Sequence, residues 1–196
     1  MTRFLLAVLG TAFLLLVILS FFLLKDSYKM LPIAGSDPNL VPAFTDWHEF
    51  KPSSKSFQAK FPTLPQAGSQ TIRDSKTGAL RQYNMYISEK SNGTVFMVSL
   101  INFPDNTESM ETLKKTIIND LLISNPQNQL KSMQIGNYKL FKTIDFVIKN
   151  PSTTIEGRAF SDGNMVYLLT VIFNNAFYNH EEYEYFINSF EWITPL

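Results

Sequence analysis

The chain has 196 residues, 17 basic and 17 acidic side chains, no cysteine and only two histidines, and 14% of its residues are aromatic. The balanced charge gives no general basic surface for nucleic acid. The absence of cysteine excludes disulfides, thiolate metal sites and a cysteine nucleophile, and two histidines exclude a histidine-rich metal site.

The first predicted element is an apolar segment from Phe4 to Leu24, which is 21 residues long and carries no charge. A helix of that length spans the roughly 30 Å hydrocarbon layer. We therefore expect residues 1–25 to form a transmembrane anchor or signal-anchor. A cleaved signal peptide is the alternative, but its apolar region is usually about 7–15 residues long.

Two sequence signals disagree about which side of the membrane holds the rest of the chain. Arg3 precedes the apolar segment and Lys25 and Lys29 follow it, which slightly favours a cytoplasmic C-terminal part. A very short leader before a long apolar run is, however, typical of an export signal-anchor. We expect a single-pass membrane protein whose globular domain is exported to the periplasmic or extracytoplasmic side.

Residues 26–52 are rich in proline, with Pro32, Pro38, Pro42 and Pro52. Prolines at this density discourage helices and strand pairing. The segment is therefore predicted to be a linker to a domain at residues 53–196, with Trp47 and Phe50 as its first contacts with that domain.

Strand patterns open the domain. They occur at Ser56–Phe61, near Gly68–Arg73, at Leu80–Glu89 and at Thr94–Phe103. Ser91-Asn92-Gly93 predicts a hairpin, because Asn-Gly supplies two positive-φ positions.

From Thr107 onward the apolar residues recur at helical spacing. This pattern predicts an amphipathic helix that ends before Pro126. Its apolar stripe comprises Met110, Leu113, Ile117 and Leu121, widened by Ile118 and Leu122.

Strand patterns then return and a second helix closes the chain. The strands are expected at Gln129–Ile135, Tyr138–Lys149, Thr153–Phe160 and Met165–Phe173, with turns at Gly136-Asn137 and Asp162-Gly163-Asn164. Asn179 is the expected helix cap, and the buried stripe after it comprises Tyr183, Phe186, Ile187 and Phe190. Successive hairpins predict an α+β domain whose antiparallel sheet is flanked by helices.

Several short motifs resemble the PsbP-like family, which is named for an extrinsic photosystem II protein. They are the opening "SFQAKFPTLPQ", the strands "RQYNMYI" and "VFMVSLINFP", the hairpin "IEGRAFSDGNMVYLLTVIF" and the closing "YEYFINSFEW". The resemblance covers about Phe50 to Ile193 and suggests a bacterial member of that family. It implies an α/β/α sandwich and a role as an accessory or binding protein rather than an enzyme, and it carries no metal site over to this chain.

The sequence contains no catalytic signature. His48 has no Gly-x-Ser-x-Gly turn to accompany it, and His180 stands at a helix N-terminus, where a positive charge is disfavoured. There is no glycine-rich phosphate loop. Glu181, Glu182 and Glu184 are interpreted as a solvated face. We expect no cofactor and no metal, and a non-enzymatic role is favoured.

Charge is distributed unevenly along the domain. Residues 114–149 carry a local net charge of +4, and residues from Thr153 onward carry −5. If these regions occupy different faces, the domain is dipolar and is oriented toward an acidic partner or anionic lipid. The candidate partner-binding basic patch comprises Lys114, Lys115, Lys131, Lys139, Lys142 and Lys149.

Three functions remain open on this basis. The first is a membrane-anchored, non-catalytic accessory or assembly module that binds a protein partner at the membrane surface. The second is a binding protein for a small apolar ligand in a pocket between sheet and helix. The third is a hydrolase with an unrecognised site.

Overall fold

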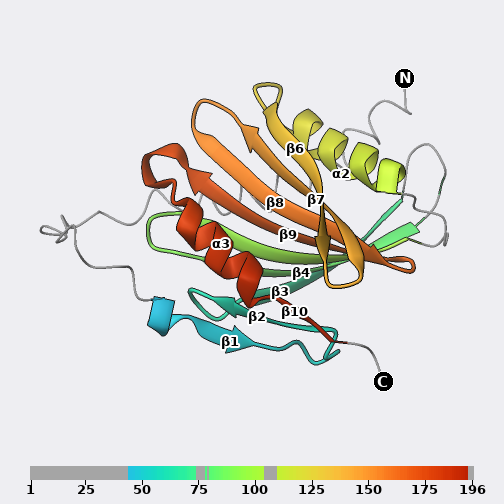
Figure 1. Cartoon of the computed structure of the whole chain (residues 1–196), viewed down its shortest axis with the longest axis horizontal. Coiled ribbons are helices and arrows are strands. Elements are labelled where there is room, and N and C mark those ends of the chain that lie inside the picture. Colours follow the sequence, from blue (N-terminus) through green and yellow to red (C-terminus); the bar gives the residue numbers. More distant parts are fainter. Residues whose placement is uncertain (1–43, 74–77, 79, 104–109, 194–196) are drawn as a thin grey trace, which may run out of the picture.

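The computed structural model describes residues 44–73, 78, 80–103 and 110–193, with only the backbone described at 45 and 110–116 (Figure 1). The predicted anchor at Phe4–Leu24 and most of the predicted linker lie outside these ranges. No helix within the described ranges is both long and apolar enough to cross a bilayer.

Strands, two α-helices and two short 3-10 helices, labelled η, make up the described ranges. In order, the elements are η2 (Phe44–Asp46), β1 (His48–Phe50), β2 (Phe57–Phe61), β3 (Gln66–Arg73), β4 (Leu80–Glu89), β5 (Val95–Asn102), α2 (Met110–Ser124), β6 (Gln129–Tyr138), β7 (Phe141–Lys149), β8 (Thr153–Asp162), β9 (Met165–Asn174), η3 (Asn175–Phe177), α3 (His180–Ser189) and β10 (Glu191–Trp192).

Seven strands form one antiparallel sheet in the order β3-β4-β5-β9-β8-β7-β6. The expectation of an antiparallel sheet built from hairpins is therefore confirmed. The one long connection, from β5 to β6, contains α2, which is why consecutive strands β5 and β6 are not neighbours. A second, small sheet has the order β1-β2-β10.

Each face of the large sheet packs on a different layer. Phe96, Leu169 and Phe173 point to the side covered by α3 and the small sheet, which we call the α3 face. Ile101 and Phe146 point to the opposite side, the α2 face, and pack with Ile117 and Ile118 of α2. Figure 1 shows α3 in front of the sheet and α2 behind it. The sheet is thus flanked by helices, as the sequence predicted.

Helix α3 starts and packs as its sequence predicts. The side chain of Asn179 caps the helix by accepting a hydrogen bond from the Glu181 N–H at 3.0 Å. Tyr183, Phe186 and Ile187 are buried in the core of the α3 face.

The fold extends into the stretch that the sequence assigned to the linker. Strand β1 pairs with β2, with Phe50 opposite Ala59. Trp47 packs edge-on against Phe96, with 4.9 Å between ring centroids. Residues from Phe44 onward therefore belong to the folded domain.

The predicted turn at Gly136-Asn137 is wrong. Both residues continue β6, and the turn lies at Lys139 and Leu140, where Lys139 has a φ of 52°. A Cβ at Gly136 would lie 2.7 Å from Thr143 Oγ1. The glycine therefore permits close packing across the hairpin rather than a turn.

The hairpin at Ser91-Asn92-Gly93 forms, but with another geometry. Only Gly93 has a positive φ, of 78°. The side chain of Asn92 accepts a hydrogen bond from the Thr94 N–H at 3.0 Å instead. The asparagine thus closes this turn through its side chain, as Asn commonly does.

Candidate functional site

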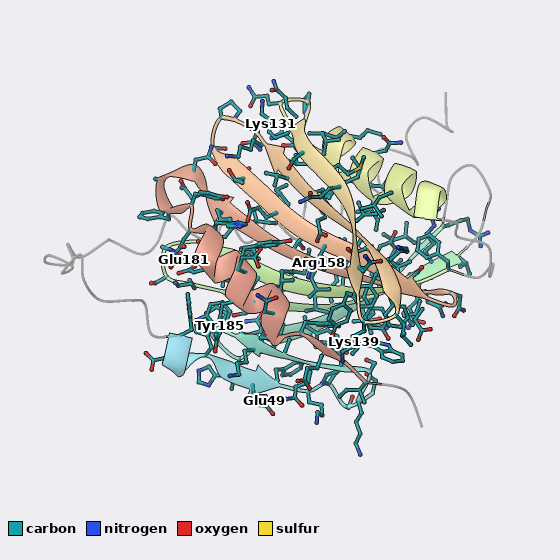
Figure 2. The ribbon with its side chains drawn as sticks, in the orientation of Figure 1. Glu49, Lys131, Lys139, Arg158, Glu181 and Tyr185 are labelled. Carbon is teal, nitrogen blue, oxygen red and sulfur yellow. The ribbon has the colours of Figure 1, made fainter. Side chains whose placement is uncertain are left out.

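A polar cleft of about 180 Å³ lies on the α3 face, between α3 and strands β6–β8. It is lined by Ser132, Gln134, Asp145, Phe146, Val147, Glu156, Arg158, His180, Tyr183 and Glu184. Figure 2 shows Arg158 over the middle of the sheet beside α3. The lining residues lie up to 52 positions apart in the sequence, from Ser132 to Glu184, so the cleft exists only because β6, β7 and β8 are neighbours and α3 packs beside them.

Glu156 is the buried acid of this cleft, with 2% of its surface exposed. Its Oε1 accepts a hydrogen bond from the Tyr178 hydroxyl at 2.6 Å, and its Oε2 lies 3.0 Å from His180 Nδ1. Burial and this carboxylate both raise the pKa of the Tyr178 phenol. Both carboxylate oxygens are therefore held by partners, as a buried charge requires.

Arg158 and Asp145 form a second pair in the cleft. The Arg158 Nε donates to Asp145 Oδ1 at 2.6 Å, and the Thr143 hydroxyl donates to the other oxygen at 3.1 Å. The side chain of Arg158 points to the α3 face, whereas its neighbours Gly157 and Ala159 belong to strand positions on the α2 face.

The two nitrogens of His180 do not face a hydroxyl in this cleft. The Nε2 of His180 lies 3.6 Å from Glu184 Oε1, so both ring nitrogens of His180 face carboxylates. This arrangement orients the ring and does not activate a hydroxyl. Within the described ranges, no three acidic or histidine side chains are arranged to hold a metal ion.

An apolar pocket of about 90 Å³ lies on the other side of the sheet, beneath α2. Its lining comprises Tyr83, Met97, Ser99, Ile101, Phe103, Ile117, Asp120, Leu121, Ser124, Ile155, Leu168, Thr170 and Ile172. Thr170 is 1% exposed, and its Oγ1 has no hydrogen-bond partner among the described residues. The second hypothesis, a pocket between sheet and helix, thus has a candidate location.

Strand β6 lies at one edge of the large sheet. Among the described residues it pairs with β7 alone. Leu130 and Ile135 lie on the α2 face of this strand, opposite Ile148 and Ile144, and Ile135 is 67% exposed. Leu140, in the turn that follows, is 96% exposed. We call β6 with Lys139 and Leu140 the β6 edge.

The structure separates the candidate lysines into two pairs along the β6–β7 hairpin. Lys131 and Lys149 lie toward one end, and Lys139 and Lys142 lie at the other. Figure 2 shows Lys131 and Lys139 at opposite ends of the sheet. At about 3.3 Å per strand residue the two ends are roughly 26 Å apart. Lys114 and Lys115 lie on α2, and their side chains lie outside the description.

Two contacts of helix α3 have no signal in local sequence patterns. The pairing of Glu156 with His180 joins β8 to α3 across 24 residues. Glu182, which the sequence placed on a solvated face, is 7% exposed and forms an ion pair with Lys90 at 2.5 Å. The tertiary contacts of α3 create both features.

Comparison with known proteins supports the fold. The sequence matches no protein-family model and no curated protein. The solution structure of cyanobacterial PsbP (CyanoP) from Synechocystis sp. PCC 6803 is similar with a TM-score of 0.53 at 7% identity, over 82% of this chain and 99% of that one. A crystal structure from Bacteroides thetaiotaomicron VPI-5482 gives a TM-score of 0.35 at 14% identity, over 76% of this chain and 49% of that one. The chain has a PsbP-like fold.

Proposed function

We propose that this protein is a bacterial member of the PsbP-like family and a non-catalytic accessory module. In this proposal Phe4–Leu24 holds it at a membrane, with the domain on the periplasmic or extracytoplasmic side. There the domain binds a protein partner and helps to assemble a complex. The partner binds at the β6 edge, which carries the proposal because it combines exposed apolar side chains with a strand edge that no other described residue pairs with.

An unpaired edge strand is a template for pairing with another chain. Proteins commonly blunt such edges with charges, bulges or covering elements. The register of β6 against β7 shifts between Leu130 and Ser132, which interrupts the start of the strand. The remainder, through Tyr138, pairs regularly and exposes Ile135. A segment of the partner could pair with this stretch and extend the sheet by one strand. The apolar side chains of that segment would then lie on the α2 face, next to Ile135.

The lysines of the hairpin indicate the charge of that partner. The ammonium groups of Lys131 and Lys142 donate to the neutral amides of Gln129 and Asn137, and the ammonium of Lys139 lies over the ring of Tyr138. None of these contacts is with an acid, and no ion pair joins these three lysines to an acid within the described ranges. A partner segment with acidic residues flanking its apolar ones is therefore favoured, because complementary charge speeds association and fixes register.

Site-specific crosslinking in the native membrane tests this proposal. The full chain would carry a photo-crosslinking amino acid at Leu140, or at Ser69 of the opposite edge strand β3 as a matched control. We expect one discrete protein adduct from position 140 and none from position 69. Adducts from position 69 alone would contradict the proposal. So would an adduct yield from position 140 that does not exceed that of the full chain without the crosslinking amino acid.

The captured partner then allows a quantitative test. Leu140→Asp should weaken its binding to the full chain at least tenfold, because the change places a negative charge on a surface that favours acidic ligands. Leu64→Asp is the control. Leu64 is exposed as well, with 69% of its surface accessible, but it lies between β2 and β3 and away from the β6 edge. Equal effects of the two substitutions would remove the β6 edge from the proposal.

A further inference from the structure

The polar cleft on the α3 face contains a buried hydroxyl that no described residue binds. Tyr183 is 6% exposed and lines the cleft. Its hydroxyl makes no hydrogen bond to another described residue, and it is not among the fully enclosed unpartnered atoms of these residues, so it is open to the cleft. A hydroxyl on a buried side chain is normally hydrogen-bonded. This group is therefore available to a ligand in the cleft.

Two further groups of the cleft have unused bonding capacity. The Nε of Arg158 donates to Asp145, whereas its terminal nitrogens Nη1 and Nη2 make no hydrogen bond to a described residue. The side chain of Glu184 is 48% exposed, and its carboxylate has only long contacts, at 3.6 Å from His180 Nε2 and 3.4 Å from Asn188 Nδ2. The cleft thus presents both free donors and a weakly held carboxylate.

The remaining polar side chains of the cleft do not decide the charge of a ligand. Asp145 and Glu156 each have both carboxylate oxygens occupied by hydrogen bonds within the described ranges. The ring nitrogens of His180 face two of the carboxylates. Ser132 and Gln134 are exposed on β6 and neutral, so they can add hydrogen bonds to a ligand of either sign.

The charge of the cleft favours a cation. Among its lining residues three acids stand against one arginine, so the net charge is −2 with a neutral histidine and −1 with a protonated one. Burial raises the pKa of the Tyr183 phenol, and the acids raise it further, whereas Arg158 lowers it. The acids therefore dominate the field at the open hydroxyl. A cleft of one predominant sign concentrates ligands of the opposite sign.

The volume of the cleft suits a small molecule. A protein cavity of about 150 Å³ holds benzene, and this cleft measures about 180 Å³. A short amine smaller than benzene fits without movement of the walls. A few polar groups that converge on one hollow are also the usual means by which proteins orient a small ligand.

We propose that this cleft binds a small protonated primary amine that also carries a neutral oxygen, such as an amino amide or an amino alcohol. The ammonium group donates to the Glu184 carboxylate and the Tyr183 hydroxyl, and the neutral oxygen accepts from the terminal nitrogens of Arg158. Because Asp145 already compensates the charge of this arginine, a carboxylate in place of the neutral oxygen meets the field of the acids. The site goes beyond the binding of a protein partner at the β6 edge, whose exposed Ile135 lies on the α2 face.

The test uses the full chain in lipid nanodiscs, with methyl-labelled valine observed by NMR, since Val147 lines the cleft. The probes are glycinamide, glycine and acetamide, which share a carbonyl group but differ in charge. We expect glycinamide to shift the Val147 methyl resonances in a saturable way, and glycine and acetamide to bind about fivefold more weakly or less. The absence of a saturable shift, or any smaller preference for glycinamide, overturns the proposal.

Three variants separate specific contacts from a general charge effect. Glu184→Gln should weaken glycinamide binding about threefold and leave acetamide binding unchanged. Glu181→Gln is the matched control, because Glu181 is exposed on the same helix but does not line the cleft (Figure 2). Tyr183→Phe removes the open hydroxyl and should also weaken glycinamide binding about threefold. Equal effects of the two glutamate substitutions, or unchanged binding to the folded Tyr183→Phe chain, overturn the proposal.

Discussion

At Gly157 the lack of a side chain allows strand β8 to pack closely against the ring of Phe146. A Cβ at this position of β8 would lie 2.3 Å from Cζ of Phe146 on the neighbouring strand β7. Phe146 is buried in the core of the α2 face. The ring of Phe146 occupies the space that a side chain at position 157 would need. Interiors packed to this density tolerate little added volume.

Tyr183 couples the stability of the domain to alkaline pH. Burial raises the pKa of its phenol above the ordinary value of 10, and the nearby charge of Asp145 raises it further. A raised phenol pKa gives stability that is complete below pH 10 and is lost as the pH rises through the folded-state value. By pH 11 the free energy of unfolding should fall about 1.4 kcal/mol more in the unmodified chain than in Tyr183→Phe.

Urea unfolding at pH 8 and pH 11 measures this difference. The comparison between the two chains cancels the other tyrosines, because both chains contain them. An equal loss in the two chains would show that Tyr183 ionises in the folded state as easily as in the unfolded state.

Helix α3 is held in place by the buried side chains of Tyr183, Phe186 and Ile187. The ring of Phe186 is fully buried, with its centroid 5.3 Å from that of Phe61 on β2 and 5.5 Å from that of Phe96 on β5. The helix therefore joins the small sheet to the large one, and its opposite side contributes His180 and Glu184 to the polar cleft. Core packing and cleft geometry thus depend on the same ten-residue element.

Removal of this central ring should destabilise the whole domain. We expect Phe186→Ala to lower the free energy of unfolding by about 3–5 kcal/mol, because it leaves a cavity between two sheets. Phe186→Asp should prevent folding, because it buries an unpaired charge. Thermal unfolding followed by circular dichroism measures both, with the exposed Asn188→Ala on the same helix as the control. Unchanged melting of Phe186→Asp would mean that α3 does not pack in this way.

At the scale of the whole molecule, two cores share a single sheet. The core of the α3 face is rich in phenylalanine and includes the small sheet, whereas the core of the α2 face is mainly aliphatic. The strand β1 and Trp47 belong to the first core, although they lie in the proline-rich stretch. The domain therefore begins earlier in the chain than its strand patterns suggest.

Two truncated chains test where the domain begins. A chain that starts at Lys51 lacks Trp47, Phe50 and the β1 pairing, whereas a chain that starts at Pro42 keeps them. We expect the shorter chain to lose about 3 kcal/mol of stability and to melt about 6–12 °C lower. Differential scanning calorimetry of both chains measures this. Equal melting temperatures would show that β1 is dispensable for folding.

The candidate sites were predictable from the sequence only in part. The lysines of the β6–β7 hairpin are visible as a charge excess, but strand geometry separates them into two pairs. The Glu156–His180 contact and the unpaired hydroxyl of Thr170 have no local signal. Each arises from the docking of a helix on a strand distant in the sequence, which no short pattern encodes.

The sequence by itself determined most of the elements and the antiparallel class of the sheet, but not the strand β1 in the predicted linker. Alternation in Leu80–Glu89 and helical spacing after Met110 follow from backbone periodicity, which is a local property. Only the tertiary structure decided the strand order, the true turn at Lys139 and the positions of the two pockets. These depend on which side chains meet across the sheet, as Gly136 meets Thr143 and Asp145. The physical reason is that packing between distant segments is selected by the fit of whole layers, and periodicity specifies only which face each residue occupies.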